Sequence, residues 1–473
     1  MTARTKIIIS DLHLGAGLEG AGGNRLEDFI SDIDFVEWVH GLTAESNRAG
    51  ADDVEMEFII NGDFLEMLQV PAVVRFDPTE PYPPAVYAAN DEASALLKLT
   101  HITQGHPGLF AALADFISRQ PRRSVVILRG NHDPELYWPG VQNALRHLLG
   151  AIGDMHDLLL FPPLSYLTDG VYVEHGNQYT ESVNRFQNPS APLDPQDPTR
   201  LESVWGSRFV FEYFNQIERE RYWVDGVTPM TGLIWHGLHY DFPFAAHALK
   251  LLLAAVPRLG LPREVSPKQI DAISTLEADL ADPNNLPALQ ERYESDPAFR
   301  QEFEARVLEA LRDTGRDDTL LPSTRDLTPA DALARADQLT DEYRQRLRDA
   351  AQRIAADTQA RLVTFGHTHA SETITLADGA RYINSGAWIG VTDFSHATPA
   401  QWEDLFRRPE AYANRRQLAF VRVDYDAAGQ LNARLLHVGQ PTPAGGTGGG
   451  SVYPAPAPAT GCLPTWLRRA FRR

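Results

Sequence analysis

The sequence predicts an α/β fold, because short apolar runs that each end in a polar cluster alternate with longer helical patterns. Five runs rich in β-branched residues each lead into a polar cluster that contains Gly, Asn, Asp or His: 6–9, 56–60, 124–128, 171–173 and 362–365. Runs of this length with such boundaries are typical of buried strands. Helical patterns occupy 26–42 and 94–120, and three further strands are expected at 381–383, 418–423 and 433–437. Alternating strands and helices predict a layered α/β core that binds ligands at its strand ends.

The chain has 473 residues, which exceeds the usual size of one compact domain, so an insertion or a second domain is expected. The stretch 188–356 is almost free of strand signals, and its first part, 201–262, is rich in aromatic residues. We therefore expect a mostly helical cap or lid at 188–356, between core segments at 1–187 and 357–439. A linker rich in Gly, Pro and Ala, with a basic tail, is expected at 440–473.

Composition limits the partners that are expected. The formal net charge is −20, and an acidic surface repels the nucleic-acid backbone, so nucleic acid is disfavoured as a partner. The single cysteine, Cys462, excludes an internal disulfide, and the apolar run 7–9 is too short for a signal-peptide core, so a cytoplasmic location is expected. His and charged residues interrupt the longest apolar stretch, 233–256, which argues against a transmembrane helix. Peripheral membrane contact through the insertion or the tail at 463–473 stays open, as does the oligomeric state.

Polar residues at the ends of the predicted strands are the candidate metal ligands. They are Asp11, His13, Asp63, Asn131, His175, His367 and His369. Asp11 and His13 lie two residues apart just past a strand, so in extended backbone both side chains face the same ion. Carboxylate and carboxamide oxygens mixed with imidazole suit Mn²⁺, Fe or Zn²⁺. Each motif alone is a weak signal, but their coincidence at five strand ends predicts one metal site.

At these residues the sequence resembles the calcineurin-like metallophosphoesterase superfamily. The matching motifs are Asp11-Leu-His13, Gly62-Asp63, Gly130-Asn131-His132-Asp133, His175-Gly176 and Gly366-His367-Thr368-His369. The resemblance spans residues 7–391 apart from the insertion. It implies a four-layer αββα sandwich, in which two mixed sheets are flanked by helices.

The resemblance also implies a role for each motif residue. One ion would be held by Asp11, His13, Asp63 and His369, and a second by Asp63, Asn131, His175 and His367, with Asp63 bridging. His132 would be the acid near the leaving group, oriented by Asp133. Two divalent ions are therefore the expected cofactors, with Mn²⁺ preferred and Fe or Zn²⁺ as alternatives. The expected reaction is hydrolysis of a phosphomonoester, phosphodiester or pyrophosphate bond by a hydroxide that bridges the two ions.

Within the superfamily, the sequence looks most like the UDP-2,3-diacylglucosamine pyrophosphohydrolases. The shared features are Ser10-Asp-Leu-His-Leu-Gly15, Gly62-Asp63-Phe-Leu-Glu66, Gly386-Ala-Trp388 and a helical insertion between the His175 and His367 motifs. That family usually carries Arg in place of His132 and Asp in place of Asn177, and its insertion is shorter. The expected substrate is thus a small-molecule or lipid-linked phosphoester. Arg25 and Asn177 are candidate substrate-binding residues.

Two other functions remain open. A nuclease is one, although the acidic charge argues against it, and a steep salt dependence of nucleic-acid binding would support it. A membrane-associated binding protein with structural metals is the other, and turnover of a chromogenic phosphodiester with Mn²⁺ separates it from an enzyme. A third metal site at His236, His239 and Asp241 is weighed against packing histidines, which are favoured. The glycine-rich loop 15–23 is a candidate mobile lip of the site.

Overall fold

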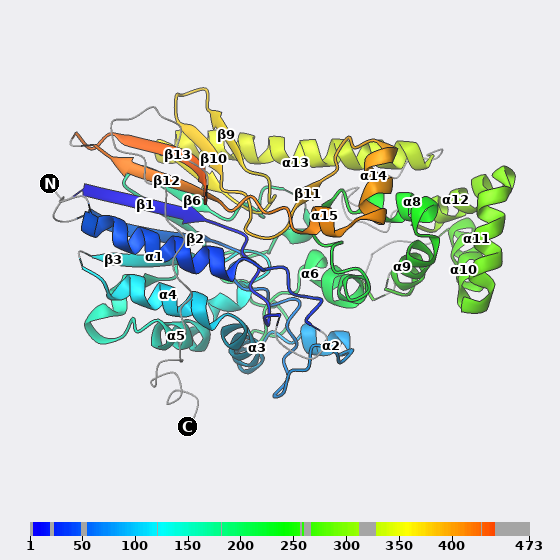
Figure 1. Cartoon of the computed structure of the whole chain (residues 1–473), viewed down its shortest axis with the longest axis horizontal. Helices are drawn as coiled ribbons and strands as arrows, with labels where there is room; N and C mark the ends of the chain where they lie inside the picture. The colour runs from blue at the N-terminus through cyan, green and yellow to red at the C-terminus, as the bar shows by residue number, and fades with distance from the viewer. Residues whose placement is uncertain are drawn as a thin grey trace.

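The chain has a mixed α/β structure, as expected from the sequence (Figure 1). A computed structural model describes residues 3–18, 23–48, 54–120, 122–180, 182–255, 258–259, 266–311, 328–426 and 428–439. The linker and basic tail predicted at 440–473, and part of the glycine-rich loop, therefore lie outside the described residues. Among the described helices, none has the length and apolar character needed to span a membrane.

One sheet has six strands in the order β13-β12-β1-β2-β3-β4. Its strands are β1 (Ala3–Ile9), β2 (Val54–Asn61), β3 (Arg123–Leu128), β4 (Leu159–Leu160), β12 (Ala419–Tyr425) and β13 (Leu431–His437). Strands β1 to β4 run parallel, with Ile8 beside Ile59 and Ile59 beside Val126, whereas β12 and β13 extend the sheet as antiparallel strands. The carboxyl ends of β1, β2 and β3 therefore meet at one edge.

The second sheet has five strands in the order β5-β6-β8-β10-β9. They are β5 (Ser165–Thr168), β6 (Val171–Glu174), β8 (Leu362–Phe365), β9 (Glu372–Thr375) and β10 (Arg381–Asn384). Strands β6, β8 and β10 are parallel, and β5 and β9 flank them as antiparallel edge strands. All eight strands expected from the sequence are present, within a few residues of the expected bounds, and these two sheets contain them.

The two sheets pack face to face through fully buried aliphatic side chains, including Ile8, Ile59 and Val126 from the first sheet and Leu362 and Ile383 from the second. Helices α1 (Asp32–Arg48), α3 (Glu92–Gly105), α4 (Pro107–Ser118) and α5 (Pro139–Leu148) cover the outer face of the first sheet. Helix α13 (Pro329–Thr358) covers the outer face of the second. The order of layers is thus helix, sheet, sheet, helix.

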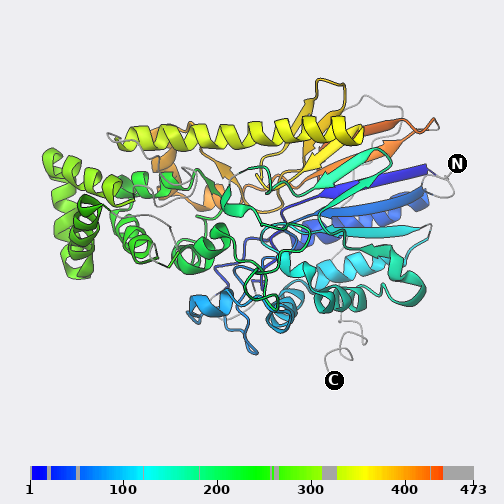
Figure 2. The same cartoon turned by 180° about the vertical axis from the view of Figure 1, so that it is seen from behind.

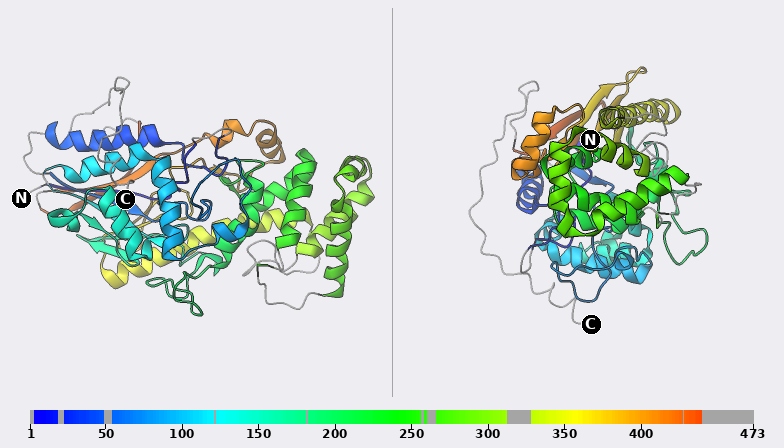
Figure 3. Two further views of the ribbon diagram at one scale, coloured as in Figure 1. Left: turned by 90° about the horizontal axis from the view of Figure 1, so that it is seen from below. Right: turned by 90° about the vertical axis from the view of Figure 1, so that its right-hand side faces the viewer.

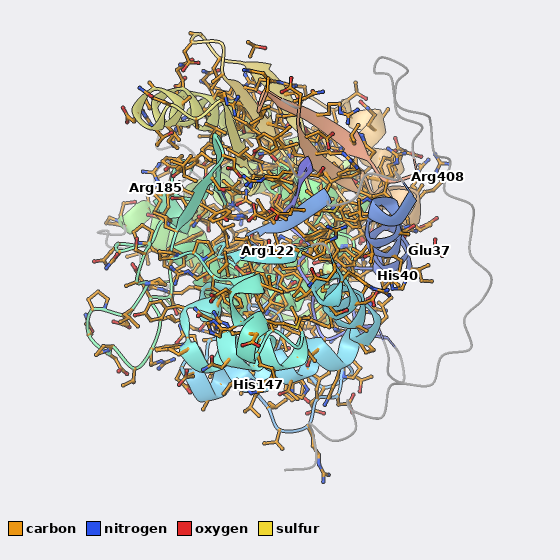
Figure 4. The ribbon with its side chains drawn as sticks, turned by 90° about the vertical axis from the view of Figure 1, so that its left-hand side faces the viewer. Glu37, His40, Arg122, His147, Arg185 and Arg408 are labelled. Atoms are coloured by element: carbon orange, nitrogen blue, oxygen red, sulfur yellow. The ribbon has the colours of Figure 1, made fainter. Side chains whose placement is uncertain are left out.

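Helix α1 shows how the sequence places this layer. Phe35 and Val39 are fully buried against the sheet, whereas Glu37 and His40 are exposed and lie on the outer side of the helix in Figure 4. The apolar residues recur three to four positions apart, which is the spacing that gives an α-helix one buried face.

Two helical expectations need correction. The helix expected at 26–42 begins only at Asp32, because Asn24 and Glu27 instead form local bonds with backbone amides of the loop before it. The segment expected to be helical at 94–120 is two helices, α3 and α4, separated at His106. Pro107 explains this break, since proline has no N–H to donate and disfavours helical backbone at the preceding residue.

The segment between β6 and α13 is mainly helical and extends from one end of the sheets (Figures 1 and 3). It contains α6 (Trp205–Phe209), a π-helix (Val210–Phe214), α7 (Asn215–Glu218), α8 (Thr231–Tyr240), α9 (Phe242–Ala255), α10 (Pro267–Ala281), α11 (Leu286–Ser295) and α12 (Pro297–Leu311). The same segment contains 3-10 turns at Ser182–Asn184 and Pro283–Asn285, and short elements elsewhere are α2 (Pro84–Tyr87) and 3-10 turns at Pro134–Tyr137 and Gly153–Leu158. The insertion has its own hydrophobic core, separate from those of the sheets.

A later segment of the chain also belongs to this second core. Strand β7 (Val227–Thr228) pairs with β11 (Thr392–Asp393), and α14 (Pro399–Arg407) and α15 (Glu410–Ala413) follow β11. Phe394, Trp402 and Tyr412 are buried among the insertion's side chains. The expected core segment 357–439 is therefore not uniform, because 392–413 packs against the insertion.

Helix α13 joins the two parts of the molecule. A capping box at Thr328 starts it, and Gln359 ends it with a left-handed φ of 55°. Ala332 near its start lies in the insertion's core, whereas Leu347 and Ala351 pack on the second sheet. Figure 2 shows the helix running without a break from the insertion to the sheets.

Candidate metal centre

The loops after five parallel strands bring the seven predicted metal ligands to one end of the sheets. In Figure 1 the arrow of β1 points toward the helical insertion, so the ligand loops lie between the sheets and the insertion. Two groups of side chains each have potential ligand atoms within 4.8 Å of one another: Asp11, His13 and His369, and Asp63, His175 and His367. Residues from distant parts of the chain thus form two adjoining groups of nitrogen and oxygen donors.

Asp63 lies between the two groups. Its Oδ2 is 3.0 Å from His175 Nε2 in one group and 3.8 Å from His13 Nε2 in the other. In the group that contains His13, His369 Nε2 lies 3.4 Å from Asp11 Oδ1 and 3.2 Å from His13 Nε2. The position of Asp63 is that of a carboxylate able to contact ions in both groups.

Two buried ligand atoms lack hydrogen-bond partners. Asn131 Oδ1 and His175 Nε2 are both inaccessible to solvent and form no hydrogen bond of acceptable geometry, although His175 Nε2 lies 3.0 Å from Asp63 Oδ2. A buried polar atom without a partner costs free energy, so such an atom in a native structure calls for an explanation. Both atoms belong to the predicted ligand set, and a mixture of carboxylate, carboxamide and imidazole donors fits divalent ions.

Neighbouring groups fix the orientation of two imidazole rings, those of His13 and His175. His13 Nδ1 lies 2.7 Å from Glu66 Oε2, and His175 Nδ1 lies 2.9 Å from the carbonyl oxygen of Asn61. A proton on Nδ1 that is donated to these oxygens leaves the lone pair of Nε2 directed at the ligand group. This is the usual arrangement around metal-ligating histidines.

The backbone at the ligands is conformationally strained. Five of the seven predicted ligands have a left-handed φ, between 46° and 68°: Asp11, His13, Asp63, His367 and His369. Non-glycine residues rarely adopt this region, and each instance costs about 1–3 kcal/mol that the surrounding structure must offset. Clustering of such residues is typical of functional sites. The left-handed conformation occurs in tight turns at the strand ends and directs the side chains of the predicted ligands toward one another.

Two glycines make room for the ligands. Gly62 has a φ of +80°, and a Cβ there would overlap the ring of His175. A Cβ on Gly130 would overlap the carboxylate of Asp63 and would lie 2.6 Å from the Asp63 backbone nitrogen. The glycines in these motifs therefore allow close approach of neighbouring loops.

We expect Gly130→Ala to weaken metal binding and to lower the free energy of unfolding by about 1–3 kcal/mol, the usual cost of overpacking. The added methyl group must displace Asp63, and a backbone atom cannot rotate away. Metal analysis and denaturant unfolding measure the two effects. Gly108→Ala in α4 is the matched control, because its Cβ would meet only Val36, at an ordinary 3.6 Å. Equal behaviour of the two variants would contradict the close-packing role of Gly130.

The expected role of Asp133 is wrong in one respect. Asp133 does not orient His132, because its carboxylate accepts hydrogen bonds from the backbone amides of Phe64, Leu65 and Gly130 and is fully buried. Glu66 performs that task instead, with its Oε2 2.7 Å from His132 Nδ1. The Asp133 carboxylate therefore connects the loop after β3, which carries Gly130, with the loop after β2, which carries Phe64 and Leu65.

Glu66 thus contacts both His13 and His132 through one carboxylate oxygen. Burial raises the pKa of Glu66, but the two histidines outweigh burial and lower it to about 2. Burial lowers the pKa of His132, but Glu66 and Asp63 outweigh burial and raise it to about 10. Sequence reasoning gave Glu66 no role, although it lies in the Gly62-to-Glu66 motif that carried the family resemblance.

A cavity of about 680 Å³ opens beside the ligands. Asp63, Asn131, His132, His367 and His369 line one part of it. Apolar side chains line much of the rest, and they come mainly from the insertion and α13: Val183, Trp205, Phe209, Val210, Phe214, Val227, Met230, Leu339, Tyr343 and Leu347. The cavity therefore joins a polar, metal-ligand end to an apolar wall.

The two predicted substrate-binding residues do not line this cavity. Arg25 is exposed and donates to the carbonyl oxygens of Arg219 and Glu220. Asn177 is buried and donates to the carbonyl oxygen of Asn184. Both side chains hold neighbouring segments in place in this conformation.

The third metal site considered at His236, His239 and Asp241 does not form. His236 stacks on Trp402, with ring centroids 4.7 Å apart, and Asp241 pairs with Arg221 at 2.8 Å. His239 packs beside Tyr293. These residues stabilise the insertion, as the packing interpretation predicted.

No family model matches the chain, and a comparison with curated proteins finds no match either. Assignment of a function therefore depends on the motifs and on the geometry of the site.

Proposed function

We propose that this chain is a metal-dependent hydrolase of phosphoester or phosphoanhydride bonds, of the calcineurin-like metallophosphoesterase type. The observation that carries the proposal is the position of Asp63 between two groups of buried ligands. The order of helix, sheet, sheet and helix supports it, since this is the architecture that the motif resemblance implies.

Asp11, His13, Asp63 and His369 would hold one ion, and Asp63, Asn131, His175 and His367 the other. Two divalent ions at such a site supply a nucleophile at neutral pH and neutralise charge on the phosphoryl oxygens. The chain contributes fixed rings at His13 and His175, and a rigid loop in which the His132 amide donates to Asp63 Oδ1 at 2.8 Å.

His132 is suited to donate a proton to the leaving group. Glu66 anchors its Nδ1, the ring lines the cavity, and the other ring nitrogen is left to face a substrate. General acid catalysis by a positioned histidine contributes typically about 10²–10⁴-fold to a rate. His132 would therefore act on the departing oxygen, while Glu66 acts as a positioning residue.

The cavity supports a substrate with an apolar portion next to its phosphoester. Side chains such as Trp205, Phe209 and Met230 extend the wall away from the ligand groups. Ligand sites are typically apolar clefts with a few convergent polar groups, and this cavity has that composition. A lipid-linked phosphoester fits the cavity better than a nucleic acid does, since the net charge of −20 repels a polyanion.

The direct test is hydrolysis of a chromogenic phosphodiester and a chromogenic phosphomonoester by the whole chain. We expect turnover that is abolished by chelation and restored by Mn²⁺, with Fe²⁺ and Zn²⁺ as comparison arms. A protein that binds these ions without hydrolysing either substrate, or any pyrophosphate-linked substrate, would favour the alternative in which the metals are structural.

We expect His132→Ala to retain metal but to slow hydrolysis by about 10²-fold or more for substrates with poor leaving groups. Good leaving groups need little protonation, so their rates should fall less. A series of substituted aryl phosphodiesters measures the dependence on leaving-group pKa. His147→Ala, on the exposed side of α5, is the control for removing an imidazole. An equal loss across the series would show that His132 is not the acid.

A further inference from the structure

A third group of carboxylates lies where the helical insertion meets the sheets. Asp28 comes from the loop that precedes α1, whereas Glu218 ends α7 and Asp225 precedes β7 in the insertion. One carboxylate oxygen from each residue lies within 4.8 Å of the other two. None of the three belongs to the ligand groups described above. The chain thus brings three acids together where the sheet-containing part meets the insertion.

The described cations near the group form no salt bridge with it, although Asp225 contributes to the raised pKa of His132 and of His369. Glu218 is fully buried and its Oε1 has no hydrogen-bond partner, although Gln69 donates to the other oxygen. Asp28 Oδ2 is likewise buried and unpartnered. No described Lys, Arg or His side chain forms a salt bridge with any of the three acids. Buried charge without a partner is strongly unfavourable, so the group requires either protons or a cation.

The direction of the pKa shifts agrees with this requirement. Burial raises the pKa of Asp28 and of Glu218 well above the usual range, and the neighbouring carboxylates raise both further. Asp225 lines the cavity, so an ion has a route from solvent to the group. Carboxylate oxygens without imidazole or thiolate are ligands that hard cations such as Ca²⁺, Mg²⁺ and Mn²⁺ prefer.

We propose that Asp28, Glu218 and Asp225 bind a divalent cation through their oxygens, at a site distinct from the histidine-containing centre. The ion would join a loop of the sheet-containing part to two segments of the insertion. Other bonds cross the same boundary nearby: Asn215 donates to the Leu68 carbonyl at 3.1 Å, and Arg25 donates to carbonyl oxygens after α7. The cation would thus fasten one wall of the cavity.

Calcium binding to the full chain tests this proposal without measuring catalysis. Ca²⁺ is the suitable probe, because it takes oxygen ligands and competes poorly for sites built from imidazole. We expect equilibrium dialysis to give one Ca²⁺ bound by the wild type and by Asp63→Asn. Glu218→Gln and Asp225→Asn should each weaken it by at least about tenfold, since affinity at such sites follows the number of charged ligands. Glu220→Gln, an acid that pairs instead with His247, is the control and should bind normally.

Thermal unfolding supplies a second readout in which the sign of the change is informative. In EDTA, Asp225→Asn should be at least as stable as the wild type, because the substitution removes repulsion between like charges. Added Ca²⁺ should raise the Tm of the wild type and of Glu220→Gln but not that of Asp225→Asn. The proposal is overturned if Ca²⁺, Mg²⁺ and Mn²⁺ all fail to bind outside the histidine-containing centre. It is equally overturned if Glu218→Gln and Asp225→Asn bind Ca²⁺ as the wild type does.

Discussion

Asp63→Asn is expected to lower turnover by at least about 10³-fold, the upper range for loss of one electrostatic group in an active site. Asp63 is the carboxylate that lies between the two ligand groups, 3.0 Å from His175 and 3.8 Å from His13. A neutral carboxamide of the same shape cannot balance the charge of two cations. Metal analysis of the purified variant should show a matching loss of bound ions.

The control for Asp63→Asn is Asp115→Asn, at a partly exposed residue of α4 that pairs with Arg119. That substitution changes the same functional group and should leave both metal content and rate unchanged. Retention of two ions with a near-normal rate in Asp63→Asn would contradict the assignment of Asp63 as the shared ligand. It would also remove the main support for the proposed reaction.

Met230→Lys is expected to lower kcat/KM for a long-chain alkyl phosphodiester by about a hundredfold, since small misplacement of a substrate costs that much. Met230 is partly buried on the apolar wall of the cavity. A lysine there places a charge where an apolar chain would lie. Hydrolysis of a short-chain substrate should change little, because the ligand groups and His132 are untouched.

Met230→Leu is the matched control, as it conserves volume and polarity and should behave as the wild type for both substrates. The comparison of long-chain with short-chain substrates is the informative measurement. If the wild type shows no preference for the longer chain, the apolar wall does not bind substrate. Its aromatic residues would then serve only the packing of the insertion.

The sequence predicted the central strands of both sheets, and also the edge strand β13, because their patterns are local. The run Ser124–Leu128, for example, is almost uniformly apolar and lies in β3, which is fully buried. The edge strands β5 and β9 were not predicted, since their side chains are only partly buried and their sequences are mixed. Such strands owe their extended form to pairing with β6 and β10, which a single sequence does not reveal.

In the candidate site, too, the residues that belong to local motifs were predicted and those that depend on distant contacts were not. Short motifs at strand ends were enough to select Asp11, His13 and the other predicted ligands, which lie together because parallel strands place their carboxyl ends at one edge. The contact between Glu66 and His132 depends on how two loops pack, and the family resemblance, which implied Asp133 for this role, did not reveal it. The group formed by Asp28, Glu218 and Asp225 carries no local signal, as its members come from segments far apart in the chain.

The continuity of α13 restricts how the molecule can open. At 1.5 Å per residue its 30 residues form a rod about 45 Å long. Arg344 and Arg348 pin this rod to Asp393 and Glu372, and the chain passes from its end into β8 and then to His367. The connection from the insertion to the second sheet, through α13, therefore contains no flexible linker. We expect that any movement of the insertion relative to the sheets is a rotation about the long axis of α13. Bending of α13 itself is not expected.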